Sequence, residues 1–140
     1  MSAEHQTILL ANDLAEIARV AEAVEAFCAS HDAPVQAVFQ INLAIDEVLT
    51  NTISYGYPDG GRHEITVELA RQGAEIVIDL IDDAIAFNPL EAPEPDLDAP
   101  LEDRRIGGLG VHFVKTMMTA VSYAREGDRN RLTLRKRFTE

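Results

Sequence analysis

An alternating pattern of apolar and polar residues in the middle of the chain most strongly constrains its fold. Apolar residues occupy every second position from Ile65 to Leu69, which is typical of a strand with one buried face. Gln72-Gly73 then predicts a turn into a second strand over Glu75–Asp82, so that the two strands form a hairpin. One face of this hairpin must be covered by other elements of the chain.

Two helical patterns precede the hairpin and are suited to cover it. Asp13 with Glu16 resembles a capping box, and apolar residues then recur at helical spacing to near His31. Pro34 predicts the start of a second helix, which continues to about Tyr55 before a glycine and a proline stop it. We therefore expect two helices to be packed on the hairpin.

The remaining segments complete one α/β domain. A short strand is expected over His5–Leu10, and a long polar stretch over Asp83–Arg105 follows the hairpin. A helix over Leu109–Met118 and strands over Ser122–Arg125 and Arg131–Phe138 follow. The 140 residues then form a single domain, a two-layer α/β sandwich. We expect a mixed, mostly antiparallel sheet of about five strands, with three helices on one face.

Composition limits the classes of partner and compartment. The formal net charge of -12 argues against a nucleic-acid or anionic-membrane surface, since both would repel the chain. No apolar run reaches membrane-spanning length, and the first residues lack the features of a signal peptide. Cys28 is the only cysteine, and the four histidines show no metal-ligand spacing. The cytoplasm is the expected compartment.

Two polar residues of the second helix are candidates for binding a metal ion. Glu47 and Asn51 are four residues apart, so they lie on one stripe of the helix. Magnesium favours oxygen ligands and keeps several waters, so this carboxylate and carboxamide could hold a hydrated Mg²⁺. An ordinary solvated stripe is the alternative interpretation.

An acidic residue at the end of the hairpin is a candidate for binding a base. Asp82 continues the face of Ile76, Ile78 and Leu80, so strand geometry turns it toward the core. A carboxylate in that position is costly unless it is hydrogen-bonded, and an adenine amino group is a suitable donor. The alternative is that the strand ends at Leu80 and that Asp82 caps a turn.

A glycine cluster after the long polar stretch is a candidate for binding phosphate. The segment Asn88–Gly107 contains four prolines and six acids, and a loop of this length is usually a functional lid or disordered. Glycines before a helix leave backbone N–H groups bare, and the helix dipole there favours phosphate. Arg104 and Arg105 would add cationic contacts. A simple tight turn is the alternative.

These features, in this order, resemble the GHKL ATPase superfamily, and within it the small anti-sigma regulatory factors that are serine/threonine kinases. The resemblance extends from Asp13 to Arg137. It rests on Glu47 with Asn51, Asp82-x-Ala84 with Phe87-Asn88-Pro89, the glycine cluster Gly107–Gly110, the preceding lid-like segment, and a closing strand.

The resemblance implies ATP and Mg²⁺ as cofactors and a role for each matching residue. Asn51 would coordinate Mg²⁺, and Glu47 would orient or deprotonate the attacking hydroxyl group. Asp82 would bind the adenine amino group. The other nucleotide-binding positions that it implies are Ala84, Phe87, Arg105, Gly107, Gly108, Leu109, Gly110 and Asn130.

The resemblance also implies an activity and partners. The activity is transfer of the γ-phosphoryl group of ATP to a serine or threonine of an anti-anti-sigma protein with a STAS domain. The same protein would alternatively sequester a sigma factor, and a homodimer is expected. A nucleotide-gated binding module with little kinase activity, and an interaction domain that has lost its pocket, are the alternative functions.

Three departures from the family pattern bear on the pocket. The first motif glycine of the family is Ala84 here, and the second is Ala86. If position 84 requires a positive φ or a close approach of the base, alanine would weaken the pocket. Asn130 stands at about the position of an adenine-site threonine in relatives, and its carboxamide can still donate and accept hydrogen bonds.

Overall fold

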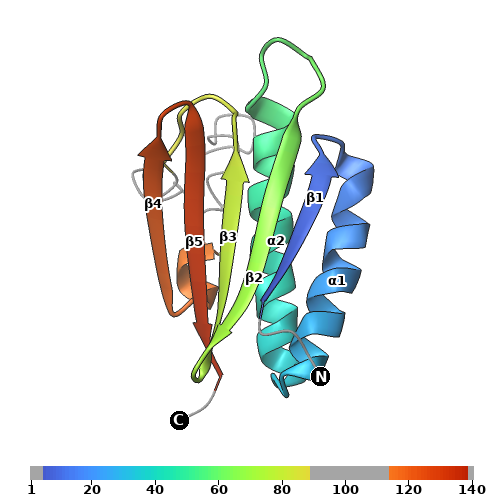
Figure 1. Cartoon of the computed structure of the whole chain (residues 1–140), viewed down its shortest axis with the longest axis vertical. Coiled ribbons are helices and arrows are strands. Elements are labelled where there is room, and N and C mark those ends of the chain that lie inside the picture. The colour runs from blue at the N-terminus through green and yellow to red at the C-terminus, as the bar shows by residue number, and fades with distance from the viewer. Residues whose placement is uncertain (1–4, 89–113, 139–140) are drawn as a thin grey trace, which may run out of the picture.

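The structure, a computed structural model, describes residues 5–88 and 114–138 (Figure 1). Five strands form one sheet in the order β1-β2-β3-β5-β4. The strands are β1 His5–Ala11, β2 Glu64–Gln72, β3 Glu75–Asp82, β4 Ala120–Glu126 and β5 Arg129–Arg137. The five-stranded sheet is confirmed, and its four pairings are all antiparallel rather than mixed.

Two long helices carry the chain away from the end of β1 and back to it, so β2 begins beside Ala11 and pairs with β1 in the antiparallel direction. Helix α1 spans Ile17–Ser30 and α2 spans Val35–Tyr55, and both lie on the same face of the sheet (Figure 1). Helix α2 begins directly after Pro34 and ends at Tyr55, directly before Gly56, as predicted. Proline lacks an N–H group and therefore suits a helix start, where that group would be unpaired.

The start of α1 differs from the predicted capping box. The Asp13 carboxylate accepts a hydrogen bond from the Ala15 N–H (3.0 Å), while Glu16 Oε1 accepts from the Ala11 N–H (3.3 Å). A short 3₁₀ turn over Leu14–Glu16 separates Asp13 from the α-helix. The two side chains therefore stabilise this turn and its junction with β1, and they do not cap one another's backbone.

The core lies between the sheet and the helices. Alternate residues of the strands face the helices, and α1 and α2 bury one stripe each against them. Residues 114–117, which begin the described C-terminal part, form a helical turn; Val114 in this turn and Met118 directly after it are buried in the same core. The third helix is therefore confirmed over this part, while residues 109–113 of the predicted helix lie outside the described residues.

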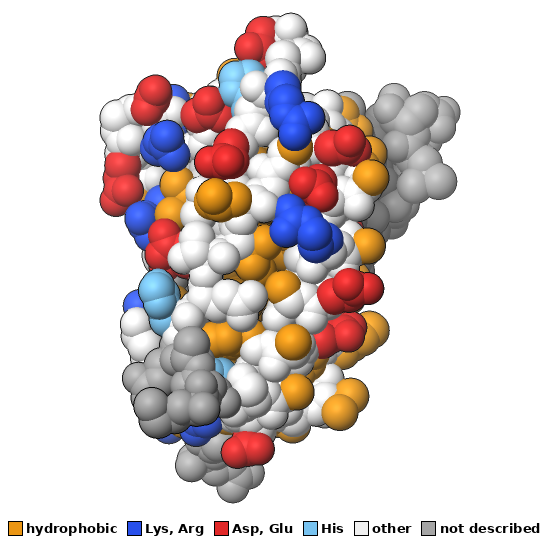
Figure 2. Space-filling view, turned by 45° about the vertical axis from the view of Figure 1, so that its right-hand side comes forward, with side chains coloured by type: hydrophobic (Ala, Val, Ile, Leu, Met, Phe, Trp, Pro, Cys, Tyr) orange, Lys and Arg blue, Asp and Glu red, His pale blue; other side chains and the backbone are white. Residues whose placement is uncertain are grey.

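The surface is mixed in charge on the face shown in Figure 2. Acidic and basic side chains are interspersed there, and the basic ones do not gather into one broad patch. No helix within the described residues combines the length and apolar character needed to cross a membrane.

Candidate functional site

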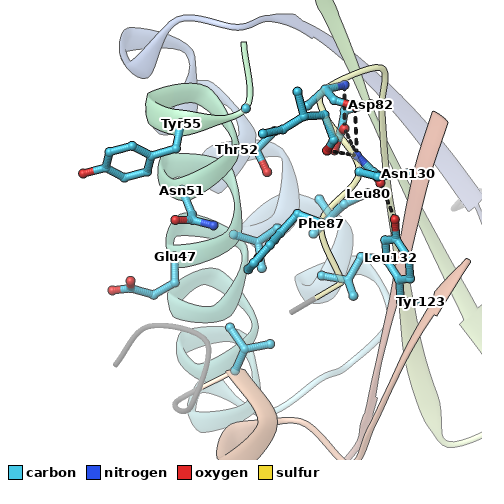
Figure 3. A pocket seen from close by; sticks show the side chains of 16 residues that line it. Glu47, Asn51, Thr52, Tyr55, Leu80, Asp82, Phe87, Tyr123, Asn130 and Leu132 are labelled. Atoms are coloured by element: carbon cyan, nitrogen blue, oxygen red, sulfur yellow. Dashed lines mark hydrogen bonds between the residues drawn. The ribbon is translucent and has the colours of Figure 1, made fainter. Parts of the chain in front are cut away.

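A pocket of about 320 Å³ opens between α2, the end of β3 and the inner face of β4 and β5 (Figure 3). Its volume lies within the range of small-molecule sites. It is lined by Glu47, Val48, Asn51, Thr52, Tyr55, Gly56, Leu80, Asp82, Ala84, Ile85, Ala86, Phe87, Val114, Tyr123, Asn130 and Leu132. The pocket thus brings together all the predicted site residues that the structure describes.

One stripe of α2 supplies the first polar wall. Glu47, Asn51 and Tyr55 are spaced four residues apart, and their side chains project from the same side of the helix (Figure 3). Leu49, by contrast, points into the core and is buried. Glu47 and Asn51 both line the pocket, so they do not form a merely solvated stripe.

Asp82 supplies the acceptor on the opposite wall. It is the last residue of β3 and only 7% exposed, so the prediction that its side chain turns inward is confirmed. Asp82 Oδ1 accepts hydrogen bonds from the Ala84 N–H (3.0 Å) and from Asn130 Nδ2 (2.9 Å). Burial raises the pKa of the carboxyl group, and these hydrogen bonds oppose the rise by stabilising the charged form.

Asn130 faces Asp82 across the sheet. The two residues are partners in the β3–β5 register, and Asn130 is itself only 6% exposed. Asn130 Nδ2 also donates to the carbonyl oxygens of Ala84 (3.3 Å) and Ile85 (3.0 Å). The carboxamide therefore holds both the carboxylate and the segment that follows β3.

Ala84 occupies the position of the family's first motif glycine without backbone strain. Ala84 does not have a positive φ; among the described residues other than glycine, Asp32 has one. The Ala84 side chain is buried close to Gly56, where an added Cβ would lie 2.8 Å from the Ala84 Cβ. The glycine at position 56 therefore leaves room for the methyl group at position 84.

Four polar residues of the site were not predicted from the sequence. Thr52 and Tyr55 belong to α2, and Tyr55 continues the four-residue spacing of Glu47 and Asn51, a signal that could have identified it. Tyr123 lies in β4 and lines the pocket. Arg125 Nη1 donates a hydrogen bond to the carbonyl oxygen of Ala84, a lining residue (3.0 Å). Arg125 carried no sequence signal, because the pairing of β4 with β5 places it there.

The predicted phosphate-binding residues are not among those that the structure describes. Arg105, Gly107, Gly108, Leu109 and Gly110 lie outside the described residues, as does most of the acidic segment before them. Their role as a phosphate-binding loop stays a prediction.

A second polar cluster lies beside the pocket and was also not predicted. His63 Nδ1 is 2.9 Å from Asp83 Oδ2, and His63 Nε2 is 3.0 Å from Asp59 Oδ2. The ring of Tyr57 stacks on that of His63, with centroids 4.5 Å apart. The two carboxylates raise the pKa of His63, because each accepts a hydrogen bond from the imidazolium form.

This cluster makes folding stability depend on pH. A histidine with a raised pKa in the folded state contributes stability that is complete below its unfolded pKa of about 6.5 and is lost as pH rises through the folded pKa. We expect the free energy of unfolding to decrease as pH rises from the unfolded to the folded pKa of His63. In His63→Gln this decrease should be smaller. Urea titrations at a series of pH values measure it.

His5→Gln serves as the control, because His5 lies at the opposite end of β1 from the His63 cluster. An unchanged pH profile in the His63 variant would contradict the assignment of this interval to His63.

Comparison with known proteins finds similarity to a serine/threonine-protein kinase and to anti-sigma F factors. The serine/threonine-protein kinase BtrW of Bordetella bronchiseptica is 32% identical over 96 residues, which cover 69% of this chain and 68% of that protein. An anti-sigma F factor of Clostridium beijerinckii is 27% identical over 117 residues, which cover 83% of this chain and 82% of that protein.

Solved structures share the fold at low sequence identity. A crystal structure of RsbU and RsbW domains from Mycobacterium tuberculosis matches with a TM-score of 0.70 and 16% identity, over 99% of this chain and 33% of that chain. A histidine kinase domain from Erythrobacter litoralis matches with a TM-score of 0.57 and 16% identity, over 89% of this chain and 60% of that chain. This chain thus spans about a third of the first structure and less than two thirds of the second. The histidine kinase-like ATPase domain family matches residues 10–136, and this chain belongs to that family.

Proposed function

We propose that this chain is an anti-sigma regulatory factor that binds Mg-ATP and phosphorylates a serine or threonine of a STAS-domain anti-anti-sigma protein. Membership of an ATPase family implies ATP binding, and relatives named as a serine/threonine-protein kinase and as anti-sigma F factors support the more specific activity. The observation that carries the proposal is the pocket, in which Glu47 and Asn51 share a wall opposite the buried acceptor Asp82.

The chemistry of the pocket fits an adenine nucleotide. Asp82 offers a carboxylate oxygen to the amino group of the base, and Leu80, Phe87 and Leu132 offer apolar contact to its ring. A hydrogen bond from a ligand to a charged acceptor contributes about 1.5–3 kcal/mol. Asp82 and these apolar residues would therefore hold the base, which leaves the α2 residues for the phosphates and the metal ion.

Asn51 and Glu47 fit the metal and catalytic roles. Mg²⁺ requires oxygen ligands, and the Asn51 carboxamide oxygen provides one from the wall of the pocket. When bound, the ion neutralises the charge that develops on the phosphates. The Glu47 carboxylate, one helical turn away, would take the proton from the attacking hydroxyl group. The hydroxyl oxygen then bonds to the γ-phosphorus, the bond to the β-phosphate bridging oxygen breaks, and ADP leaves.

The proposed partners complete a switch. The STAS-domain protein is the phosphoryl acceptor, a sigma factor is the alternative binding partner, and the chain acts as a homodimer in the cytoplasm. The net charge of -12 favours basic surfaces on such partners.

Phosphoryl transfer to a cognate STAS-domain protein tests the proposal. The purified chain is incubated with Mg²⁺, γ-labelled ATP and each STAS-domain protein encoded in the same genome, and calorimetry measures ATP and ADP binding in parallel. We expect label on a serine or threonine of one such protein. Tight ATP binding without transfer to any of them would favour a nucleotide-gated binding module instead. Absence of adenine-nucleotide binding would contradict both functions.

A further inference from the structure

The hydrogen bonds around Asp82 are distributed unequally between its two oxygens. Both hydrogen bonds that the described residues make to this carboxylate, from the Ala84 N–H and from Asn130 Nδ2, are made to Oδ1. Oδ2 receives none from the part of the chain that the structure describes. Since Asp82 lines the pocket, a ligand there has one carboxylate oxygen available to it, while the second is already occupied.

Hydrogen bonds to both the NH₂ group and the carbonyl oxygen of Asn130 fix the orientation of its carboxamide. Its Nδ2 faces three acceptors, namely Asp82 Oδ1 and the carbonyl oxygens of Ala84 and Ile85. Its Oδ1 accepts from the Tyr123 hydroxyl (Figure 3) and from Arg125 Nη1, the latter at 3.1 Å. A flipped amide would place an oxygen against three acceptors and an NH₂ group against two donors. Tyr123 and Arg125 therefore keep the NH₂ group of Asn130 on Asp82.

This arrangement can distinguish adenine from guanine, because the two bases present different numbers of neighbouring hydrogen-bond donors. Adenine presents a single amino group beside a ring acceptor, so one free carboxylate oxygen satisfies it. Guanine presents its N1–H and N2–H groups side by side, and a carboxylate matches that pair by using both oxygens. With Oδ1 of Asp82 already occupied, the second guanine donor has no partner, and a buried unpaired donor is unfavourable.

We propose that Asn130, held by Tyr123 and Arg125, is a specificity-determining residue that makes the pocket select adenine over guanine nucleotides by occupying Asp82 Oδ1. The proposal rests on the proposed function, because it assumes that the pocket binds a purine nucleotide. Asn130 acts on the base through Asp82, so it is a positioning residue, and removing its NH₂ group should change discrimination more than affinity.

The ratio of the GTP and ATP dissociation constants tests this role. Calorimetry with Mg²⁺ measures both constants for the wild type and for Asn130→Leu, which has a similar volume but no donor. We expect this ratio to fall at least tenfold in the variant. Asn130→Thr, which retains a hydroxyl donor, is expected to keep most of the discrimination. Tyr123→Phe, which frees one side of the amide, should lower the ratio by a smaller factor.

Thr133→Val is the matched control. Thr133 also lies in β5 and donates to an aspartate of β3, Asp79, but on the outer face of the sheet. This variant should leave the nucleotide ratio unchanged, and thermal unfolding of each variant shows whether it is folded. A purely structural role of Asn130 would weaken both nucleotides equally, and an unchanged ratio in folded Asn130→Leu would therefore overturn the inference. Absence of ATP binding to the wild type would instead contradict the proposed function.

Discussion

Replacement of Asp82 by asparagine is expected to lower the affinity for Mg-ATP roughly 10- to 150-fold, which corresponds to a charge-assisted hydrogen bond of about 1.5–3 kcal/mol. The new carboxamide oxygen would keep the hydrogen bonds from Asn130 and the Ala84 N–H that Oδ1 now accepts. Its NH₂ group would then face the pocket, where it opposes the adenine amino group. For the same reason, the variant should bind ITP, which has an oxygen at that position, more tightly than the wild type does.

Calorimetry with both nucleotides measures this change, and Asp79→Asn is the control. Asp79 lies on the same strand as Asp82 but on the outer face, where Arg131 and Thr133 contact it. Folding should be retained in Asp82→Asn, because burial raises the pKa of the native carboxyl group and a neutral side chain avoids the cost of a buried charge. Equal loss of ATP and ITP binding would contradict the proposed orientation of the base.

Replacement of Glu47 by glutamine is expected to reduce the rate of phosphoryl transfer by roughly 10²–10⁴ while ATP affinity stays close to that of the wild type. Glutamine has the size of glutamate but cannot accept the proton of the attacking hydroxyl group. Because the loss then concerns only the chemical step, kcat should fall and the dissociation constant for ATP should not. Single-turnover transfer of labelled phosphate to the proposed STAS-domain partner, together with calorimetry, measures the two quantities.

Asp46→Asn provides a matched control on the same helix. Asp46 is the preceding residue, but its carboxylate accepts a hydrogen bond from the Thr50 hydroxyl (3.0 Å) and lies outside the nucleotide pocket. Its replacement should leave the transfer rate unchanged. Near-normal transfer by Glu47→Gln would remove Glu47 from the proposed mechanism.

The fold could be predicted from the sequence wherever one local pattern decided the outcome. Alternation of apolar residues identified β2 and β3, and Pro34 with Gly56 bounded α2 correctly. The start of α1 was less predictable, because the Glu16 carboxylate accepts a hydrogen bond from the Ala11 N–H rather than from the Asp13 N–H that a capping box requires. The antiparallel direction of the four pairings among the described strands depended on how the connecting segments return the chain, and no local sequence pattern indicates this.

The site was predictable where one element carried it. The spacing of Glu47 and Asn51 and the inward face of Asp82 followed from helical and strand geometry alone. Arg125 could not be identified in this way, because its contact with Asn130 depends on the β4–β5 register. The His63 cluster is similar, since Asp59 and Asp83 come from segments that meet only in the folded chain.

The pairing of Asp82 with Asn130 also bears on how the chain acquires its ligand during synthesis. β5 lies between β3 and β4 in the sheet although it follows β4 in the sequence of the described residues. Asp82 and Arg125 can therefore not be held in their final positions before β5 has been inserted. A nascent chain that lacks this strand would present the α2 residues without an ordered acceptor opposite them. Nucleotide capture should thus follow completion of the sheet, and the free energy of binding would stabilise the finished domain rather than an early intermediate.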